Sequence, residues 1–421
     1  MVNYVRLKRR YGYFSAGAEW AKWTSERLLA LRAQIAREIP PKSARDTLLI
    51  ASWNIRDFGK STFNPSPRLP ETSYYIAEIL SAFDIIAVQE IGDLDQFDQL
   101  MKLMGKNWDY IISDMTEGAS GNGERIAFVF DTNRVFTRNV VGEVVLTEAR
   151  EIGGDATTVK LPAGTQLETD DGVLDLDKGD LLHLPEGQKV VDRKQFARTP
   201  FLVAFQAGWF KFTLCSAHIY FGKARGAKYE RRVKELAALA RFFKDRSADN
   251  DENYIILGDF NVVSTEDDTM KALLDNGFSV PQELWGLATN MMRNAIYDQI
   301  AFRVKEKELE IPDFANHPNA GVFNCFENVF RANHDDGVPQ GESFDHLTAE
   351  TSDFAHYLDN LPADKIENFT EVEKRAYYWR KWRTWQMSDH MPLWVALKTD
   401  FADDYLKEAI ELAEQDLAEE G

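Results

Sequence analysis

The chain has few cysteines and no long apolar run. Cys215 and Cys325 are the only cysteines among its 421 residues, too few for a disulfide framework or a cysteine-based zinc cluster. No stretch of about 18 consecutive apolar residues is present, so we expect no membrane span. The opening sequence MVNYVRLKRRYGYF contains basic residues but neither an apolar segment nor a small-residue cleavage site, which argues against secretion. These features predict a cytoplasmic protein.

Positive charge is in the minority. The chain has 49 Lys and Arg against 68 Asp and Glu, a formal net charge of −19. Such a surface repels polyanions, which argues against non-specific coating of DNA or anionic membranes but allows a phosphate ester handled through bound cations. The charge is uneven, because residues 1–45 carry ten basic residues against three Glu, whereas 399–421 carry nine acids and one Lys. With 44% apolar residues the chain can bury a full core, which excludes global disorder.

Apolar runs alternate with helical patterns through most of the chain. Continuous apolar runs bounded by polar residues are typical of strands that are buried on both faces. Strands in such alternation with helices predict a sheet core that is covered by helices on its outer faces. The predicted strands are 48–55, 84–90, 108–113, 125–131, 201–206, 211–220, 253–260, 295–302 and 392–397, and the predicted helices between them are 72–83, 94–104 and 226–245.

Other segments do not follow this alternation. We divide the chain into a basic, largely helical arm (1–45), a main domain (46–398) with insertions at about 139–195 and 303–385, and an acidic C-terminal helix (399–421). The first insertion is rich in Gly and Asp and predicts hairpins at one edge of the sheet core. The second is irregular and polar before a helix near its end, and the C-terminal segment is amphipathic at helical spacing.

Polar side chains follow several of the apolar strands. Because the strand ends of an open α/β sheet converge on one rim, we expect these side chains to share a cleft. Asn, Asp and Glu supply the oxygen ligands that Mg²⁺ or Ca²⁺ takes, and histidines titrate near neutral pH. A carboxylate-held cation with histidines suits hydrolysis of a phosphodiester, where a base activates water and the departing alkoxide needs charge stabilisation. The residues are Asn54, Glu90, His218, Asp259, Asn261, Asp298, Asp389 and His390.

The ordered motifs around these residues resemble those of the endonuclease/exonuclease/phosphatase superfamily, most closely deoxyribonuclease I. The resemblance covers about 48–302 and 386–398, and it implies an α/β fold, a four-layer sandwich of two packed mixed β-sheets flanked by helices. The arm, the two insertions and the C-terminal helix are additions to it. The motifs are WNIRDFG, IIAVQEIGD, GERIAFVFD, FARTPFLV, CSAHIYFG, ILGDFN, YDQIAF and MSDHMPLWV.

The resemblance implies a metal site and a phosphate site. Asn54 and Glu90 would hold the principal divalent cation, with Asp389 nearby. Asp259 and Asn261 would bind the scissile phosphate or a second metal. Mg²⁺ is the expected cofactor, with Mn²⁺ or Ca²⁺ as alternatives.

The resemblance also implies two imidazole–carboxylate pairs and two arginines. His390 would be the general base, oriented by Asp298. His218, paired with Glu124, would assist the phosphate or the departing oxygen. Arg56 and Arg198 match family arginines near the phosphates, where a guanidinium can grip two oxygens. Alternatively, Asn54, Arg56 and Arg198 only stabilise loops.

Two departures from the deoxyribonuclease pattern leave the substrate open. Gly92 stands where that branch has an arginine that enters the minor groove, and 121–123 lacks its groove-stacking tyrosine. We expect a metal-dependent phosphodiesterase domain at 46–398, a DNA endonuclease of low sequence specificity. RNA or another phosphodiester is a possible substrate. The alternatives are a phosphoesterase acting on a lipid head group or a small phosphorylated molecule, and a nuclease subunit or scaffold in a larger assembly.

The segments outside the resemblance leave further alternatives. Residues 374–385 interleave cations with aromatic residues, which suits either a nucleic-acid contact or an amphipathic helix whose tryptophans lie in the core. The arm could contact phosphates or dock on the acidic C-terminal helix. Residues 1–45 and 402–420 are also candidate surfaces for self-association or for a protein partner.

Overall fold

The computed structural model describes residues 2–8, 17–60, 66–115, 123–147, 195–249, 252–305 and 309–420, together with the backbone of six short strands between 152 and 194. The chain forms two compact units. The larger unit comprises residues 1–144 and 197–421, and the smaller comprises residues 145–196.

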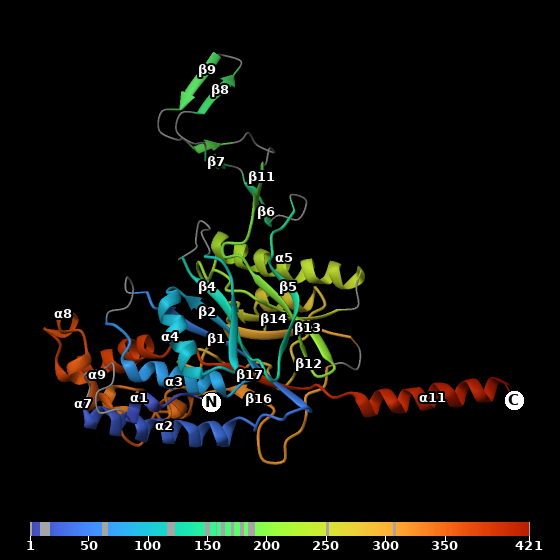
Figure 1. Ribbon diagram of the computed structural model, residues 1–421. Coiled ribbons are helices and arrows are strands. Elements are labelled where there is room, and N and C mark those ends of the chain that lie inside the picture. Colours follow the sequence, from blue (N-terminus) through green and yellow to red (C-terminus); the bar gives the residue numbers. More distant parts are fainter. Residues whose placement is uncertain are drawn as a thin grey trace. The chain divides into compact units, whose positions relative to one another are not determined.

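Two mixed β-sheets form the centre of the larger unit (Figure 1). The six-stranded sheet has the order β16 (Ala320–Val322), β17 (Leu393–Lys398), β1 (Thr47–Phe58), β2 (Ile85–Ile91), β4 (Arg125–Asp131) and β3 (Trp108–Ile112). The five-stranded sheet has the order β15 (Asp298–Arg303), β14 (Asn253–Asp259), β13 (Phe210–Ser216), β12 (Phe201–Ala207) and β5 (Phe136–Glu143). β1 and β2 are parallel, as are β13 and β14, and the other pairs are antiparallel.

The inner faces of the two sheets share one hydrophobic core. In β1, Leu48 and Ile50 point into this core, whereas Leu49, Ala51 and Trp53 pack into a second core on the outer face of the six-stranded sheet. Successive strand residues face opposite sides of a sheet, so a strand that is covered on both sides needs apolar residues at every position. This explains the continuous apolar runs in the sequence.

Helices cover both outer faces. The second core includes residues of α2 (Ala18–Glu38), α3 (Pro70–Ser81) and α4 (Leu94–Met104), and Figure 1 shows α5 (Ala227–Asp249) on the opposite side. Phe243 of α5 packs against Tyr254 of β14, with ring centroids 5.0 Å apart. α4 has the bounds that its periodicity predicts, and it begins where the Asp93 carboxylate caps the Gln96 N–H. The arrangement confirms the predicted four-layer α/β sandwich.

The N-terminal arm forms α1 (Val5–Lys8) and α2, and α2 docks on the second insertion. Trp23 Nε1 donates to the Tyr357 hydroxyl at 3.1 Å, and Gln34 Nε2 donates to the Asn324 carbonyl at 3.0 Å. α2 also contacts α3, where Arg32 Nη1 lies 3.0 Å from Glu78 Oε2. Docking of the arm on the acidic C-terminal helix stays a prediction.

The second insertion is largely a packed part of the larger unit. Its last helical stretch runs through α9 (Glu371–Tyr377), a π-helical turn (Tyr378–Trp382) and α10 (Arg383–Gln386). Trp379 and Trp382 are fully buried, so these two tryptophans belong to the core, as one of the two interpretations of this segment expected, whereas Trp385 is only partly buried. A π-helical turn often lies at a functional site, and this one precedes Trp385 and Ser388.

The first insertion and the C-terminal segment have local structure of their own. β5 runs to Glu143 and pairs with β12, so the strand that begins the predicted insertion belongs to the core sheet. The smaller unit holds three antiparallel pairs: β6 (Ile152–Ala156) with β11 (Val190–Lys194), β7 (Thr158–Lys160) with β10 (Leu181–His183), and β8 (Thr165–Thr169) with β9 (Gly172–Leu176). α11 (Ala402–Glu420) is the expected C-terminal helix. None of the described helices is long and apolar enough to cross a membrane.

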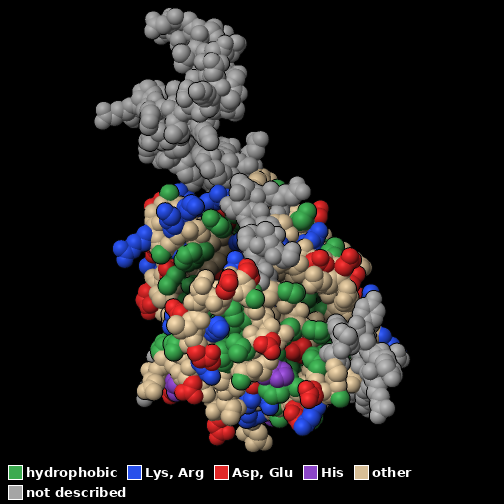
Figure 2. All heavy atoms as spheres, turned by 90° about the vertical axis from the view of Figure 1, so that its left-hand side faces the viewer, with side chains coloured by type: hydrophobic (Ala, Val, Ile, Leu, Met, Phe, Trp, Pro, Cys, Tyr) green, Lys and Arg blue, Asp and Glu red, His purple; other side chains and the backbone are tan. Residues whose placement is uncertain are grey.

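The described surface carries charges of both signs. On the face in Figure 2, acidic, basic and apolar side chains are intermixed. The net charge of −19 is therefore compatible with local cationic groups on this face.

Candidate active site

The predicted polar residues meet at one edge of the two sheets. Asn54 lies in β1 and Glu90 in β2, where the parallel pairing brings the carboxyl ends of these strands together. Asp259 ends β14, and Asp298, which pairs with it, begins β15. His218 and His390 come from short segments that follow β13 and precede β17.

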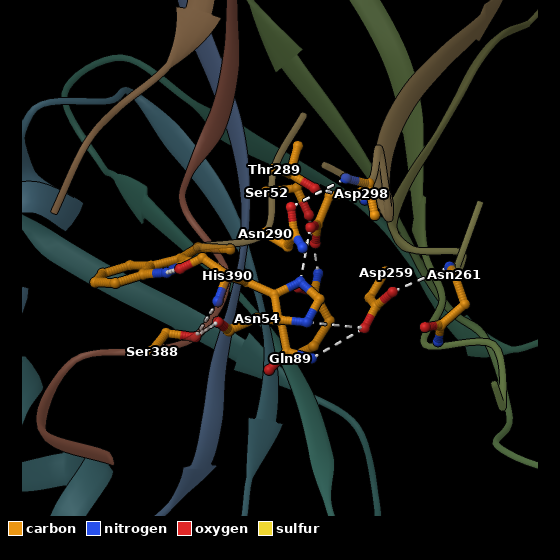
Figure 3. Close-up of polar contacts among 12 residues, drawn as sticks. Ser52, Asn54, Gln89, Asp259, Asn261, Thr289, Asn290, Asp298, Ser388 and His390 are labelled. Atoms are coloured by element: carbon orange, nitrogen blue, oxygen red, sulfur yellow. Dashed lines mark hydrogen bonds and ion pairs between the residues drawn. The ribbon is translucent and has the colours of Figure 1, made fainter. Parts of the chain in front are cut away.

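The Asp259 carboxylate contacts site residues that come from both sheets. Its Oδ2 lies 3.2 Å from Asn54 Nδ2, 3.5 Å from His218 Nε2 and 3.6 Å from His390 Nε2. Its Oδ1 accepts from the backbone N–H of Asn261 at 3.0 Å, and the Asn261 side chain donates to the Ile219 carbonyl. Figure 3 shows the His390 ring between Asp298 and Asp259. Residues that are far apart in sequence thus form one cluster.

The Asn54 amide links Asp259 to Glu90. Asn54 Nδ2 also donates to Glu90 Oε1 at 2.8 Å, while Glu90 Oε2 accepts from the Asp57 N–H at 2.7 Å. Asn54 Oδ1 accepts from the Arg56 N–H at 2.9 Å. Asn54 and Asp259 are almost completely buried, so two carboxylates share one neutral donor in a site with little water.

The backbone is strained at the same place. A left-handed backbone at a residue with a side chain costs about 1–3 kcal/mol and persists where the surrounding structure holds it, often at functional sites. Four site residues have positive φ: Arg56 (47°), Asp57 (44°), Glu90 (65°) and Asn261 (55°).

Two histidines form matching imidazole–carboxylate pairs. His390 Nδ1 lies 2.8 Å from Asp298 Oδ2, and His218 Nδ1 lies 2.7 Å from Glu124 Oε1. Each carboxylate therefore engages one ring nitrogen, and the other ring nitrogen faces Asp259. This arrangement fixes the orientation and the tautomer of each imidazole.

The acids around the rings favour protonated histidines. Burial lowers the pKa of His390, but the carboxylates of Asp298 and Asp259 outweigh it and hold that pKa well above its usual value. Burial and the Arg198 charge likewise lower the pKa of His218, and Glu124 reverses the direction, so the net shift is upward. Burial raises the pKa of Glu124, but His218 and Arg198 bring it down to about 2.

The two predicted arginines lie in different settings. Arg198 is buried, and its Nε lies 2.6 Å from Glu124 Oε1. Arg56 lies nearer the surface, with its guanidinium stacked 3.9 Å from the centre of the Trp385 ring and 3.4 Å from Asp389 Oδ2. The place of Arg198 favours orientation of the Glu124 carboxylate, whereas Arg56 is better placed for a ligand.

The donor set fits a divalent cation. Two groups of acids and histidines have ligand atoms within 4.8 Å of one another, Glu90–Glu124–His218 and Asp259–Asp298–His390. In each group, however, the imidazole Nδ1 already lies against a carboxylate oxygen. The oxygens of Glu90 and of the Asn54 amide, which can turn about its bond, are the more suitable ligands for a hard cation. Asp389 lies beside Arg56 with its side chain 45% exposed, and it stays a predicted ligand.

Ser388 and Gln89 stand in the family motifs, but the sequence did not predict which groups they contact. Ser388 Oγ donates to the Asn54 carbonyl at 2.6 Å and accepts from the His390 N–H at 3.0 Å. Gln89 Nε2 donates to Ser52 and Ser216, and so joins the two sheets beneath the site. A hydroxyl or amide at these positions is unremarkable in sequence, because its partners are known only from the fold.

Arg68 ties together the two segments that carry site residues. Its Nη2 donates to the carbonyls of Ile55 and Arg56, at 2.5 and 2.8 Å, near the end of β1. Its Nε donates to the carbonyls of Trp385 and Gln386, at 3.0 and 3.1 Å, in the segment before His390. Hydrogen bonds from a charged donor stabilise by about 1.5–3 kcal/mol each, so Arg68 holds the two segments in register.

The solved structures to which the chain is similar include an endonuclease/exonuclease/phosphatase family protein from Bacteroides thetaiotaomicron, with 16% identity, a TM-score of 0.45, and coverage of 84% of this chain and 96% of that one. The mannosyl-6-phosphatase of the same bacterium has 16% identity, a TM-score of 0.44, and coverage of 83% and 98%. TDP2 of D. rerio, complexed with a single-strand DNA product, has 13% identity, a TM-score of 0.41, and coverage of 83% and 98%.

Curated proteins offer no relative that matches this chain. Residues 51–299 match the model of the endonuclease/exonuclease/phosphatase family. This match confirms the predicted superfamily. The predicted closeness to deoxyribonuclease I stays a prediction. Because this match spans more than half of the chain, the protein belongs to that family and is a hydrolase of phosphoester bonds.

Proposed function

We propose that the protein is a divalent-cation-dependent DNA endonuclease of low sequence specificity. The observation that carries the proposal is the convergence of two imidazole–carboxylate pairs on Asp259, with His218 Nε2 at 3.5 Å and His390 Nε2 at 3.6 Å from its Oδ2. A phosphodiester needs a base for the attacking water and a donor for the departing oxygen, and the two rings are suited to these tasks.

Glu90 and Asn54 are the proposed cation ligands, with Asp389 as a third. When bound, the cation polarises a phosphoryl oxygen and neutralises charge on it. Asp259 and Asn261 are proposed to contact the scissile phosphate or a second cation. Arg56, stacked on Trp385, is proposed to bind a phosphate oxygen. Arg198 is proposed to lie near the phosphates and to orient the Glu124 carboxylate, which its Nε contacts at 2.6 Å.

His390 is the proposed general base. The Asp298 carboxylate accepts a hydrogen bond from Nδ1–H, which leaves the Nε2 lone pair to take a proton from water. His390 must be neutral for this step, although the neighbouring acids raise its pKa. A cation bound beside these carboxylates would lower that pKa again, so we expect hydrolysis to depend on cation binding.

His218 is the proposed donor. Its raised pKa favours the imidazolium, whose Nε2–H can donate to a phosphate oxygen or to the departing oxygen. The Glu124 carboxylate contacts Nδ1 of the His218 ring, and Arg198 contacts that carboxylate in turn. The two histidines therefore have opposite protonation requirements, which is the pattern of a base and acid pair.

Plasmid cleavage tests the proposal. Supercoiled DNA is incubated with the protein in Mg²⁺ or Mn²⁺, with and without a chelator. We expect nicked and then linear DNA only when the cation is present, and a loss of about 10²-fold or more in His218→Ala and His390→Ala. His317→Ala, at a surface histidine bonded to the Ala36 carbonyl, is the matched control. No nicking with any cation, or wild-type activity in both site variants, would refute the proposal.

A second candidate is a phosphoesterase for a lipid head group or a small phosphorylated molecule. The net charge of −19 favours a smaller anion than DNA. Parallel assays with plasmid, RNA, bis-p-nitrophenyl phosphate and phosphate monoesters separate the candidates. Cleavage of the monoesters alone would select this second function.

A further inference from the structure

The space beside Gly92 is filled by a lysine side chain. A Cβ built on Gly92, just after β2, would lie 2.2 Å from Cγ of Lys60, 2.7 Å from its Cε and 2.9 Å from its Cδ. A side chain at position 92 would therefore have to displace the stem of Lys60. The backbone of Gly92 does not have the positive φ that favours glycine. The stem of Lys60 is thus what a larger residue at this position would meet.

This packing places the Lys60 charge at the acidic site. The ammonium lies 3.7 Å from Asp57 Oδ1, and the Asp57 N–H donates to Glu90. The Lys60 charge lowers the pKa of Glu124, in addition to the larger effects on that group. The Lys60 side chain is 12% exposed, so most of it is covered and only part of it reaches solvent.

Lys60 and Arg56 are two cations on one short segment. They flank Asp57 at the end of β1, where the backbone at Arg56 and Asp57 is left-handed. Arg56 is 17% exposed, similar to Lys60. In a chain with a net charge of −19, two fixed cations at the edge of an acidic cluster suit a ligand with more than one negative phosphate, because each phosphate can meet a separate cation.

We propose that Lys60 binds a second, non-scissile phosphate of a polynucleotide substrate, and that Gly92 is required to seat it. The inference rests on the proposed function and narrows the substrate to a chain of phosphodiesters. Lysine supplies three N–H donors to a phosphate without demanding one geometry. The other role for the side chain is neutralisation of Asp57 alone, and the experiment distinguishes the two.

The test is binding of a fluorescent duplex oligonucleotide to His390→Ala protein in Mg²⁺, by anisotropy, between 50 and 200 mM salt. Lys60→Met should raise Kd about tenfold. It should also reduce the slope of log Kd against log salt by about 0.9, the value for one lost phosphate contact. Lys60→Arg should keep the slope. Lys22→Met, at a side chain that is 77% exposed on α2, is the matched control and should bind like the parent protein.

Gly92→Ala independently tests the packing of Lys60 against Gly92. Alanine at 92 should displace Lys60 and weaken binding as much as Lys60→Met. In Lys60→Ala the colliding Cγ is gone, so adding Gly92→Ala should change binding no further. Thermal unfolding of each variant separates weaker oligonucleotide binding from misfolding, because only folded variants enter the comparison. If Gly92→Ala does not fold, Lys60→Arg is the conservative alternative.

The phosphate contact of Lys60 and the proposed catalytic function are refuted by different results. An unchanged slope in Lys60→Met, a harmless Gly92→Ala, or no oligonucleotide binding at all would overturn the role of Lys60. A slope that depends on Lys60 in a protein that cleaves no phosphodiester would support the lysine contact and refute the catalytic proposal.

Discussion

His390 and Asp298 form a 2.8 Å contact across the two sheets. Asp298 begins β15 in the five-stranded sheet, and His390 lies just before β17 in the six-stranded sheet. Asp298 is fully buried, and its N–H donates to the Thr289 hydroxyl at 3.0 Å. The proposed base is therefore oriented correctly only when the two sheets are packed together.

Asp298→Asn should lower kcat by about 10²–10⁴-fold, because the amide no longer fixes the tautomer that leaves Nε2 unprotonated. It should also shift the pH profile. Asp298 raises the pKa of His390, and the base is active when neutral, so activity should rise with pH and that rise should move to lower pH in the variant. Steady-state cleavage at a series of pH values measures both effects. A profile that does not move would contradict the assignment of His390 as the base.

The contact between His218 and Glu124 should contribute to the pH dependence of the free energy of unfolding. The pKa of Glu124 is lowered to about 2 from 4.5, so its contribution is complete above about pH 4.5 and is lost as the pH falls toward 2. The pKa of His218 is raised from 6.5, so its contribution is complete below that value and is lost as the pH rises through the raised pKa. The pair should therefore stabilise the protein most between these two limits.

Glu124→Gln should cost about 3–5 kcal/mol in free energy of unfolding within that window, because Arg198 and the imidazolium lose a buried partner. The deficit should shrink toward pH 2. Urea unfolding at several pH values measures it, with Glu230→Gln, exposed on α5, as the control. A deficit that is constant over this pH range would show that the ionic pair is not its source.

Much of the fold could be predicted because burial leaves a mark on the sequence. Strands covered on both faces must be apolar throughout, and the runs at 48–55 and 84–90 correspond to β1 and β2. Boundaries were less predictable. Residues 295–297 are apolar like the strand that follows, yet β15 begins only at Asp298, where pairing with β14 begins.

The candidate site was predictable where family motifs mark it, and not where backbone atoms build it. The motif residues Asn54 and His390 could be named from sequence. Arg68 could not, because its acceptors are carbonyl oxygens, which every residue has. The docking of Trp23 on Tyr357 joins positions 334 residues apart and has no local signal. Gly92 was visible as a departure, but its contact with the stem of Lys60 could be seen only in the coordinates.

Arg68→Met should loosen both segments that Arg68 joins. The loss of several charge-assisted hydrogen bonds should cost about 3–5 kcal/mol of stability and lower kcat by about 10–100-fold, since Arg56 and His390 lose a shared support. Arg68→Lys should restore little, because an ammonium cannot reach carbonyls on both sides as the guanidinium does. Arg241→Met, exposed on α5, is the control. Urea unfolding and initial rates measure both effects, and a variant that loses stability but keeps kcat would limit Arg68 to a structural role.

Anomalous diffraction from crystals of the protein in Mn²⁺ tests the central claim most directly. We expect a Mn²⁺ ion bonded to the Glu90 carboxylate and the Asn54 amide oxygen, on the side of the cluster faced by Nε2 of His218 and His390, and no ion there in Glu90→Gln crystals. A protein that cleaves DNA in Mn²⁺ but binds the ion away from Glu90, or that keeps it unchanged in Glu90→Gln, would contradict the account.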